Sequence, residues 1–128
     1  MSKAIFEHIN MTVSDPDRTA QMLIDLFGWK LRWSGASMNN GRTVHVGNDE
    51  DYVALYSVGK PRQLDEGENY TLAGTVSHLG ILVDDLDAAE KRVLAHGIKT
   101  HSHQTYEPGS RFYFHDHDGI EYEVVSYA

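Results

Sequence analysis

The sequence predicts an α+β fold built from two βαβββ modules, and two observations carry this prediction. The first is an internal repeat, in which residues 6–17 (FEHINMTVSDPD) resemble residues 76–87 (VSHLGILVDDLD) at a constant offset of 70. Equivalent positions then carry similar residues: His8 and His78, Met11 and Ile81, Asp15 and Asp85. The second observation is that each repeat is followed by a helix-like stretch that ends in glycine, Gly28 in the first half and Gly97 in the second.

Each half begins with a strand that leads into an amphipathic helix. Apolar and polar residues alternate over 8–13, which is typical of a strand with two different faces. Asp15 and Pro16 then form a typical helix start, with Asp as N-cap and Pro at the first helical position. The second half has the same signals, Asp85 or Asp87 at the helix start and Gly97 at its end.

Three further segments in each half have strand character and are separated by Asn- and Gly-containing turn signals. These segments are 31–37, 42–47 and 52–58 in the first half, and 98–104, 111–116 and 121–127 in the second. The polar stretch 59–74 is expected to connect the halves. We therefore expect a single domain over 1–128, with a first module at about 5–58 and a second at about 75–127.

Composition excludes several classes of function. The chain has 11 Lys and Arg against 19 Asp and Glu, so its formal charge is −8 and nucleic acid is not an expected partner. It has no cysteine, which excludes disulfides and thiolate chemistry. No apolar run approaches the roughly 20 residues of a membrane span, and the first residues lack a signal-peptide pattern. We expect a cytoplasmic protein with no membrane partner.

Two histidines at matching positions of matching strands indicate a shared site. If the two modules pack about a pseudo-twofold axis, His8 and His78 both point into one cavity, although a single strand histidine is more often a structural residue. Glu123 is the expected third ligand, because a carboxylate among Val and Tyr side chains is costly to bury without a cation. Two imidazoles and one carboxylate suit Fe(II) or Mn(II), with Zn(II) or Ni(II) as alternatives.

The repeat also predicts that this site has no fourth protein ligand. An offset of 69 from Glu123 leads to Ala54, which cannot bind a metal. Tyr52 and Tyr56 share the face of Ala54 and are expected to contact a substrate, as is Asn10 on the polar face of the first strand.

Five other histidines lie in the second half, and four of them form two close pairs in the sequence. His101 and His103 are two residues apart and are expected to share a strand face. His115 and His117 flank Asp116 at a predicted turn, where a solvated loop is the favoured interpretation.

The pattern H-x-x-x-x-V near the start of each half, followed by Asp, a helix and Gly, resembles the vicinal oxygen chelate superfamily of glyoxalases, bleomycin resistance proteins and type I extradiol dioxygenases. The segment RFYFHDHDGIEYEVV is similar to that superfamily's aromatic-x-aromatic-x-D-P-D-G-x-x-x-E ending, with His117 in place of proline. The resemblance covers about 5–127. It implies an open, curved, mixed sheet around a metal cavity, the ligands His8, His78 and Glu123, and a homodimer.

Within this superfamily, the three-ligand set resembles that of ring-cleaving extradiol dioxygenases, whose metal chelates vicinal oxygens of a small-molecule substrate. Tyr113 then corresponds to an active-site tyrosine, and His103 and His45 are the candidates for the remaining catalytic histidines. Arg111, beside Tyr113, is expected to serve an anionic substrate.

Two other functions remain open. One is a lyase or transferase that resembles glyoxalase or the fosfomycin resistance enzymes. The other is a metal-free protein that binds a ligand in the manner of the bleomycin resistance proteins.

Overall fold

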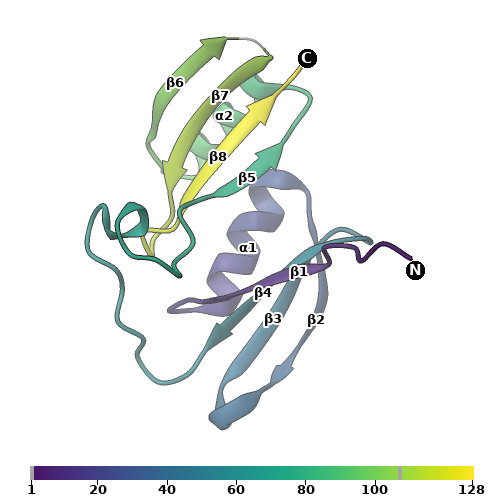
Figure 1. Cartoon of the computed structure of the whole chain (residues 1–128), viewed down its shortest axis with the longest axis vertical. Coiled ribbons are helices and arrows are strands. Elements are labelled where there is room, and N and C mark those ends of the chain that lie inside the picture. Colours follow the sequence, from purple (N-terminus) through teal and green to yellow (C-terminus); the bar gives the residue numbers. More distant parts are fainter. Residues whose placement is uncertain (1, 107) are drawn as a thin grey trace. The chain divides into compact units, whose positions relative to one another are not determined.

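The computed structural model describes residues 2–106 and 108–128, and it consists of two compact units, Met1–Arg62 and Gln63–Ala128 (Figure 1). The boundary between them falls inside the predicted connector 59–74. Each unit contains one α-helix and one four-stranded sheet. The α+β class is therefore confirmed.

The first unit is a βαβββ module. Its elements are β1 (His8–Thr12), α1 (Pro16–Phe27), β2 (Lys30–Ala36), the single turn η1 (Met38–Asn40), β3 (Arg42–Gly47) and β4 (Tyr52–Ser57). The sheet order is β1-β4-β3-β2. Strands β1 and β4 are parallel and the other two pairs are antiparallel, so the sheet is mixed, as the sequence predicts.

The second unit repeats this topology. Its elements are the single turn η2 (Glu68–Tyr70), β5 (Leu79–Leu82), α2 (Leu86–Ala95), β6 (Thr100–Tyr106), β7 (Gly109–His115) and β8 (Glu121–Ser126). The sheet order is β5-β8-β7-β6, with a parallel β5–β8 pair and two antiparallel pairs. The internal repeat in the sequence is therefore a repeat of structure.

Local capping explains where the helices begin and end. The Asp15 carboxylate accepts a hydrogen bond from the Arg18 backbone N–H (3.2 Å), and Gly28 ends α1 with a left-handed φ of 67°. The Asp85 carboxylate accepts from the Ala88 N–H at 3.0 Å. Asp85 and not Asp87 is therefore the N-cap of α2.

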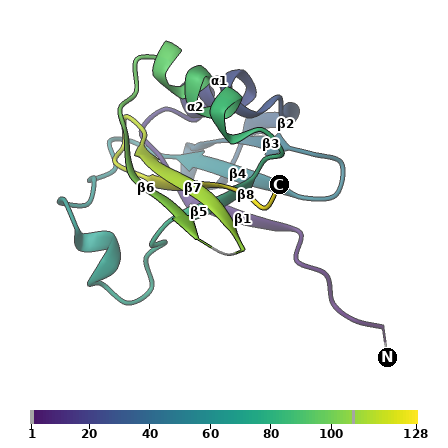
Figure 2. The same ribbon diagram turned by 90° about the horizontal axis from the view of Figure 1, so that it is seen from above.

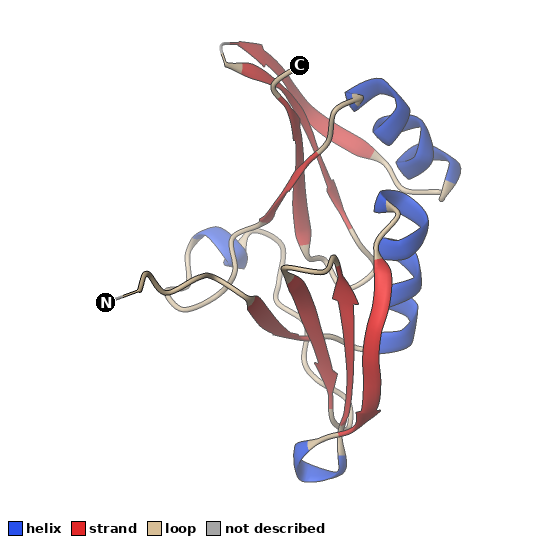
Figure 3. Ribbon diagram, turned by 90° about the vertical axis from the view of Figure 1, so that its right-hand side faces the viewer, coloured by secondary structure: helices blue, strands red, loops and turns tan. Residues whose placement is uncertain are grey.

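In each unit the helix lies along one face of its own sheet (Figure 3). Five fully buried residues form the centre of the first core: Leu23 and Leu26 of α1 with Val44, Val46 and Leu55 of the sheet. Ala89 and Val93 of α2, together with Phe112, Phe114, Tyr122 and Val124, form the second. In β7 and β8 the even-numbered residues are the ones that pack in the core, so the odd-numbered ones lie on the opposite face of the sheet.

The connector is mostly coil and contains η2 as its one helical turn in the described residues (Figure 2). Neither α-helix has the length and apolar character that a transmembrane helix requires, and η1 and η2 are single turns. This finding covers the described part of the chain.

A buried carboxylate shapes the turn that leads into β8. Asp116 accepts hydrogen bonds from the backbone N–H groups of Asp118 (2.9 Å) and Ile120 (3.0 Å), and from the Tyr122 hydroxyl (2.9 Å). The side chain of Asp116 is almost fully buried. The turn therefore has a specific conformation, which sets the first residue of β8.

We expect Asp116→Ala to lower the free energy of unfolding by about 2–4 kcal/mol, because three donors in a buried turn lose their acceptor. Tyr122→Phe, which removes one of the three hydrogen bonds, should cost about 1 kcal/mol. Urea unfolding of both variants measures the difference. A smaller loss for Asp116→Ala than for Tyr122→Phe would contradict this role for the turn.

Candidate metal centre

The face of the second sheet that does not pack against α2 carries five polar or aromatic side chains on β7 and β8. They are Arg111, Tyr113 and His115 on β7, and Glu121 and Glu123 on β8. The antiparallel register places Tyr113 opposite Glu123 and His115 opposite Glu121. Two acidic residues on one strand are therefore each brought beside a titratable or aromatic residue of the neighbouring strand.

Glu123 lies beside His78, as two of the three predicted ligands should. His78 Nε2 and Glu123 Oε1 are 3.2 Å apart, and the Glu123 side chain is 13% exposed. The other ring nitrogen, Nδ1, forms a 3.2 Å hydrogen bond with the Ser77 hydroxyl. This contact orients the ring and leaves Nε2 as the nitrogen that faces the carboxylate.

Arg111 and Tyr113 flank Glu123 on β7. Arg111 Nη1 donates to Glu123 Oε2 at 2.8 Å, and this hydrogen bond raises the pKa of Arg111. Arg111 Nε is buried and has no hydrogen-bond partner in the described residues. Burial, and then the negative charge on Glu123, raise the pKa of Tyr113, so its hydroxyl stays protonated at neutral pH.

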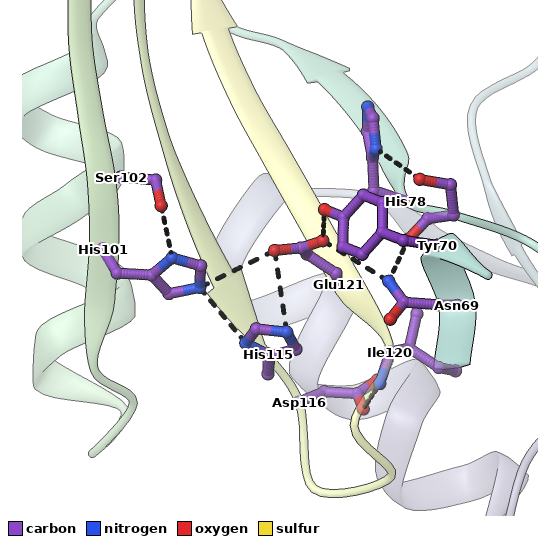
Figure 4. Close-up of polar contacts among 10 residues, drawn as sticks. Asn69, Tyr70, His78, His101, Ser102, His115, Asp116, Ile120 and Glu121 are labelled. Atoms are coloured by element: carbon purple, nitrogen blue, oxygen red, sulfur yellow. Dashed lines mark hydrogen bonds and ion pairs between the residues drawn. The ribbon is translucent and has the colours of Figure 1, made fainter. Parts of the chain in front are cut away.

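A second group of potential ligands lies on the same face, at the end of β8 where the strand begins (Figure 4). His101, His115 and Glu121 each place one ligand atom within 4.8 Å of the others. His101 Nε2 and His115 Nδ1 share a 3.1 Å hydrogen bond, and the two rings are stacked. Glu121 Oε2 lies 3.8 Å from His101 Nε2 and 3.6 Å from His115 Nε2. These three residues could hold a metal ion.

The carboxylate of Glu121 is the buried member of this group, with 5% of its side chain exposed. Its Oε1 atom accepts a hydrogen bond from the Tyr70 hydroxyl, and the Asn69 amide donates to it at 3.4 Å. Both donors come from η2, so the connector reaches the sheet here (Figure 4). Burial raises the pKa of Glu121, and the Asn69 hydrogen bond opposes this effect.

The structure separates His101 from His103, which the sequence placed on one face. His103 Nε2 pairs with Glu90 of α2 at 2.5 Å, and its ring stacks on Phe112 of the core face. A β-bulge causes the difference: the pairing shifts by one residue between His101 and Gln104, which interrupts the two-residue alternation. His103 therefore contacts α2 and the core residue Phe112, which corrects the expectation that it shares a strand face with His101.

The predicted residues of the first unit form an aromatic row on its sheet. The Tyr52 ring stacks on the ring of His8 (4.8 Å between centroids) and lies tilted against the ring of His45 (4.6 Å), and Trp33 lies 5.2 Å from His45. His8 Nδ1 pairs with Glu7 Oε1 at 2.8 Å. The ring nitrogen of His8 that this pairing leaves over is Nε2, and in His78 it is likewise Nδ1 that contacts the preceding side chain.

The remaining predicted residues of the first unit, Asn10, Ala54 and Tyr56, lie on β1 and β4. Asn10 on β1 pairs with Ala54 on β4, and Ala54 also pairs with His45 on β3. No carboxylate stands at the position that corresponds to Glu123. The Tyr56 hydroxyl donates a hydrogen bond to the Met38 carbonyl at 2.9 Å, so this hydroxyl is bound to the segment that follows β2.

Sequence comparison identifies a family for nearly the whole chain. The model of the Glyoxalase/Bleomycin resistance protein/Dioxygenase superfamily matches residues 5–124. No curated protein matches the chain.

Solved structures share the fold. A glyoxylase/bleomycin resistance protein/dioxygenase domain from Frankia sp. EAN1pec has 24% identity and a TM-score of 0.80, over 98% of this chain and 93% of that one. The fosfomycin resistance protein FosX from Listeria monocytogenes, solved with Mn(II) and sulfate, has 17% identity and a TM-score of 0.74 over the same shares. FosX from Mesorhizobium loti has 20% identity and a TM-score of 0.69, again over 98% and 93%.

We expect His45 to titrate below 6.5 in the metal-free protein, because burial and then the neighbouring His8 lower its pKa. The unfolded chain binds this proton more tightly, so the contribution of His45 to stability falls as the pH drops below about 6.5. Titration of the imidazole by NMR measures the midpoint, and His8→Gln should raise it. A midpoint at or above 6.5 would show that the ring is solvated.

Proposed function

The chain belongs to the glyoxalase/bleomycin resistance protein/dioxygenase superfamily, and from this premise we propose that it is a metal-dependent enzyme acting on a small molecule with two neighbouring oxygens. The observation that carries the proposal is the 3.2 Å approach of His78 Nε2 to Glu123 Oε1. Two ligands at bond lengths of 2.0–2.2 Å around one ion lie about 3 Å apart, so this pair fits a divalent cation.

The third ligand of the proposal is His8. It is the equivalent of His78 in the repeat, and both histidines use Nδ1 for a contact with the preceding side chain. The position that would supply a fourth ligand is Ala54. Two imidazoles and one carboxylate leave coordination positions open for a substrate and suit Fe(II) or Mn(II).

Charge indicates the kind of substrate. A divalent ion, the Arg111 cation and the Glu123 carboxylate sum to a local charge of about +2, which suits a substrate with two negatively charged oxygens. The Arg111 guanidinium has further N–H donors besides the one it gives to Glu123. The protonated Tyr113 hydroxyl can donate a hydrogen bond to one substrate oxygen.

Our first candidate reaction is extradiol-type cleavage of an aromatic diol. When bound by His8, His78 and Glu123, a divalent ion would supply Lewis acidity toward the two diol oxygens. Tyr113 would orient the substrate by its hydroxyl, and Arg111 would stabilise the anionic form of the diol. His45, on β3 of the first unit, is the proposed acid–base residue, since burial favours its neutral form.

Arg111 also favours a second candidate, a reaction on a phosphonate like that of the fosfomycin resistance enzymes. Those enzymes are represented among the structural neighbours by FosX, one of whose structures holds Mn(II) and sulfate. A guanidinium beside the metal ligands suits a phosphonate dianion. We also propose a homodimer, which analytical ultracentrifugation would test.

Removal of the metal should abolish activity, and Glu123→Ala should weaken metal binding at this site at least about 100-fold, because the anionic ligand is lost. Calorimetric titration with Mn(II) measures the affinity. Glu66→Ala removes the same charge from an exposed position and serves as the matched control. If Glu123→Ala kept its affinity, or if the protein bound its organic ligand equally well without metal, a binding protein would replace the enzyme.

Two activity assays distinguish the candidate reactions. Oxygen uptake with substituted catechols, measured on protein loaded anaerobically with Fe(II), is expected from the first and is absent from the second. Phosphonate epoxide opening by water or a thiol, followed by ³¹P NMR with Mn(II), is expected from the second. Arg111→Leu should raise KM in either assay by about tenfold or more, since a charged hydrogen bond is lost.

A further inference from the structure

The cluster of His101, His115 and Glu121 has ligand-to-ligand spacings that suit a small cation. A tetrahedral ion with bonds of 2.0–2.1 Å separates its ligand atoms by about 3.3 Å. His101 Nε2 lies 3.1 Å from His115 Nδ1 and 3.8 Å from Glu121 Oε2, whereas the 3.6 Å approach of Glu121 Oε2 to His115 is to the other ring nitrogen, Nε2. With one ligand atom taken from each residue, all separations lie within 4.8 Å. Small side-chain rotations would therefore bring the three ligand atoms around one ion.

Two of the three residues in the cluster, His101 and Glu121, are oriented by hydrogen bonds to residues outside it. Ser102, one of the two residues in the β6 bulge, forms a 2.8 Å hydrogen bond with His101 Nδ1, and this leaves His101 Nε2 directed into the cluster. Tyr70 and Asn69 hold Oε1 of Glu121, and this leaves Oε2 for the two imidazoles (Figure 4). Hydrogen bonds from outer partners of this kind fix ligand geometry in metal sites.

The first unit shows that the fold itself does not require the cluster. At the equivalent strand ends, Gly47 pairs with Tyr52, whereas His115 pairs with Glu121. His115 and Glu121 also occupy positions that the closing pattern aromatic-x-aromatic-x-D-P-D-G-x-x-x-E leaves unspecified. The buried carboxylate and its two imidazoles are therefore particular to the second half of this chain.

The cluster is separate from His78 and Glu123. Glu121 and Glu123 are two residues apart on one face of β8, so their positions differ by roughly 6.6 Å along the strand. Paired metal ions that share bridging ligands lie about 3.5–4 Å apart. Two separate ions, and not one shared centre, match this spacing.

From these observations we propose that His101, His115 and Glu121 bind a second divalent cation, Zn(II) by preference, at a site distinct from that of Glu123. Two nitrogen ligands and one carboxylate suit Zn(II) and leave a fourth position for water. Because Tyr70 and Asn69 hold the same carboxylate, the ion fastens η2 to the strand ends. Binding therefore stabilises the second unit.

Titration of the full-length, metal-free chain with Zn(II) alone tests the proposal. We expect two equivalents for the wild type and one for His115→Ala, whose side chain is 46% exposed and whose loss leaves the core intact. Glu123→Ala should also bind one equivalent, and the double variant should bind none. His96→Ala removes an exposed imidazole at the end of α2 and should still bind two.

The pattern of losses separates this proposal from the proposed function. If the wild type binds one equivalent that Glu123→Ala abolishes and His115→Ala retains, the second site is refuted and the first stands. If the one equivalent is lost in His115→Ala and retained in Glu123→Ala, the cluster is the metal site and the proposed function fails.

A conservative variant and a thermal measurement keep the proposal testable if His115→Ala or Glu123→Ala folds poorly. In Tyr70→Phe the Glu121 carboxylate keeps its place but loses one donor, and we expect Zn(II) to bind there roughly 10–100-fold more weakly. Zn(II) should also raise the thermal midpoint of the wild type and of Glu123→Ala, but not that of His115→Ala in the Glu123→Ala background. An unchanged Zn(II) affinity in Tyr70→Phe would refute the proposal that η2 orients the Glu121 carboxylate for metal binding.

Discussion

The two-sided pairing of β8 is the constraint on which the polar face of the second unit depends. β8 lies between β5 and β7, so it cannot slip without loss of hydrogen bonds on both sides. Its even-numbered residues, Tyr122 and Val124, are fully buried beside α2. A slip of one residue would place Glu121 and Glu123 in that core, at a prohibitive desolvation cost. Hydrophobic packing thus decides which face carries the carboxylates.

Local signals in the sequence predicted the fold well, because they act over a few residues. Asp15 and Gly28 cap a helix by contacts within one turn, and the alternation over 121–126 needs no distant partner. The positions of His78 and Glu123 followed from the same alternation combined with the repeat. The predicted strand face of His103 is wrong because a β-bulge adds one residue to β6, and the hydrophobic pattern of the sequence contains no signal for this bulge.

The second cluster was beyond prediction from the sequence for a different reason. Its three residues come from β6, β7 and β8, and their approach depends on the register of two antiparallel pairs. The two-residue alternation of β8 places Glu121 on the face of Glu123, but the sequence predicts a solvated turn at His115. Tyr70 and Glu121 are 51 positions apart in the sequence, and their contact depends on the path of the coil connector beside the sheet.

The bulge itself occurs in both halves. In β2 the pairing shifts between Leu31 and Trp33, so Arg32 is the extra residue, and an offset of 70 leads from Arg32 to Ser102. Arg32 lies over the Tyr52 ring, whereas Ser102 holds His101. A bulge residue at this place has no ladder partner, so its side chain can differ between the halves without loss of strand pairing. The two halves could therefore acquire different chemistry at one shared irregularity, with the strand pairing on either side unaltered.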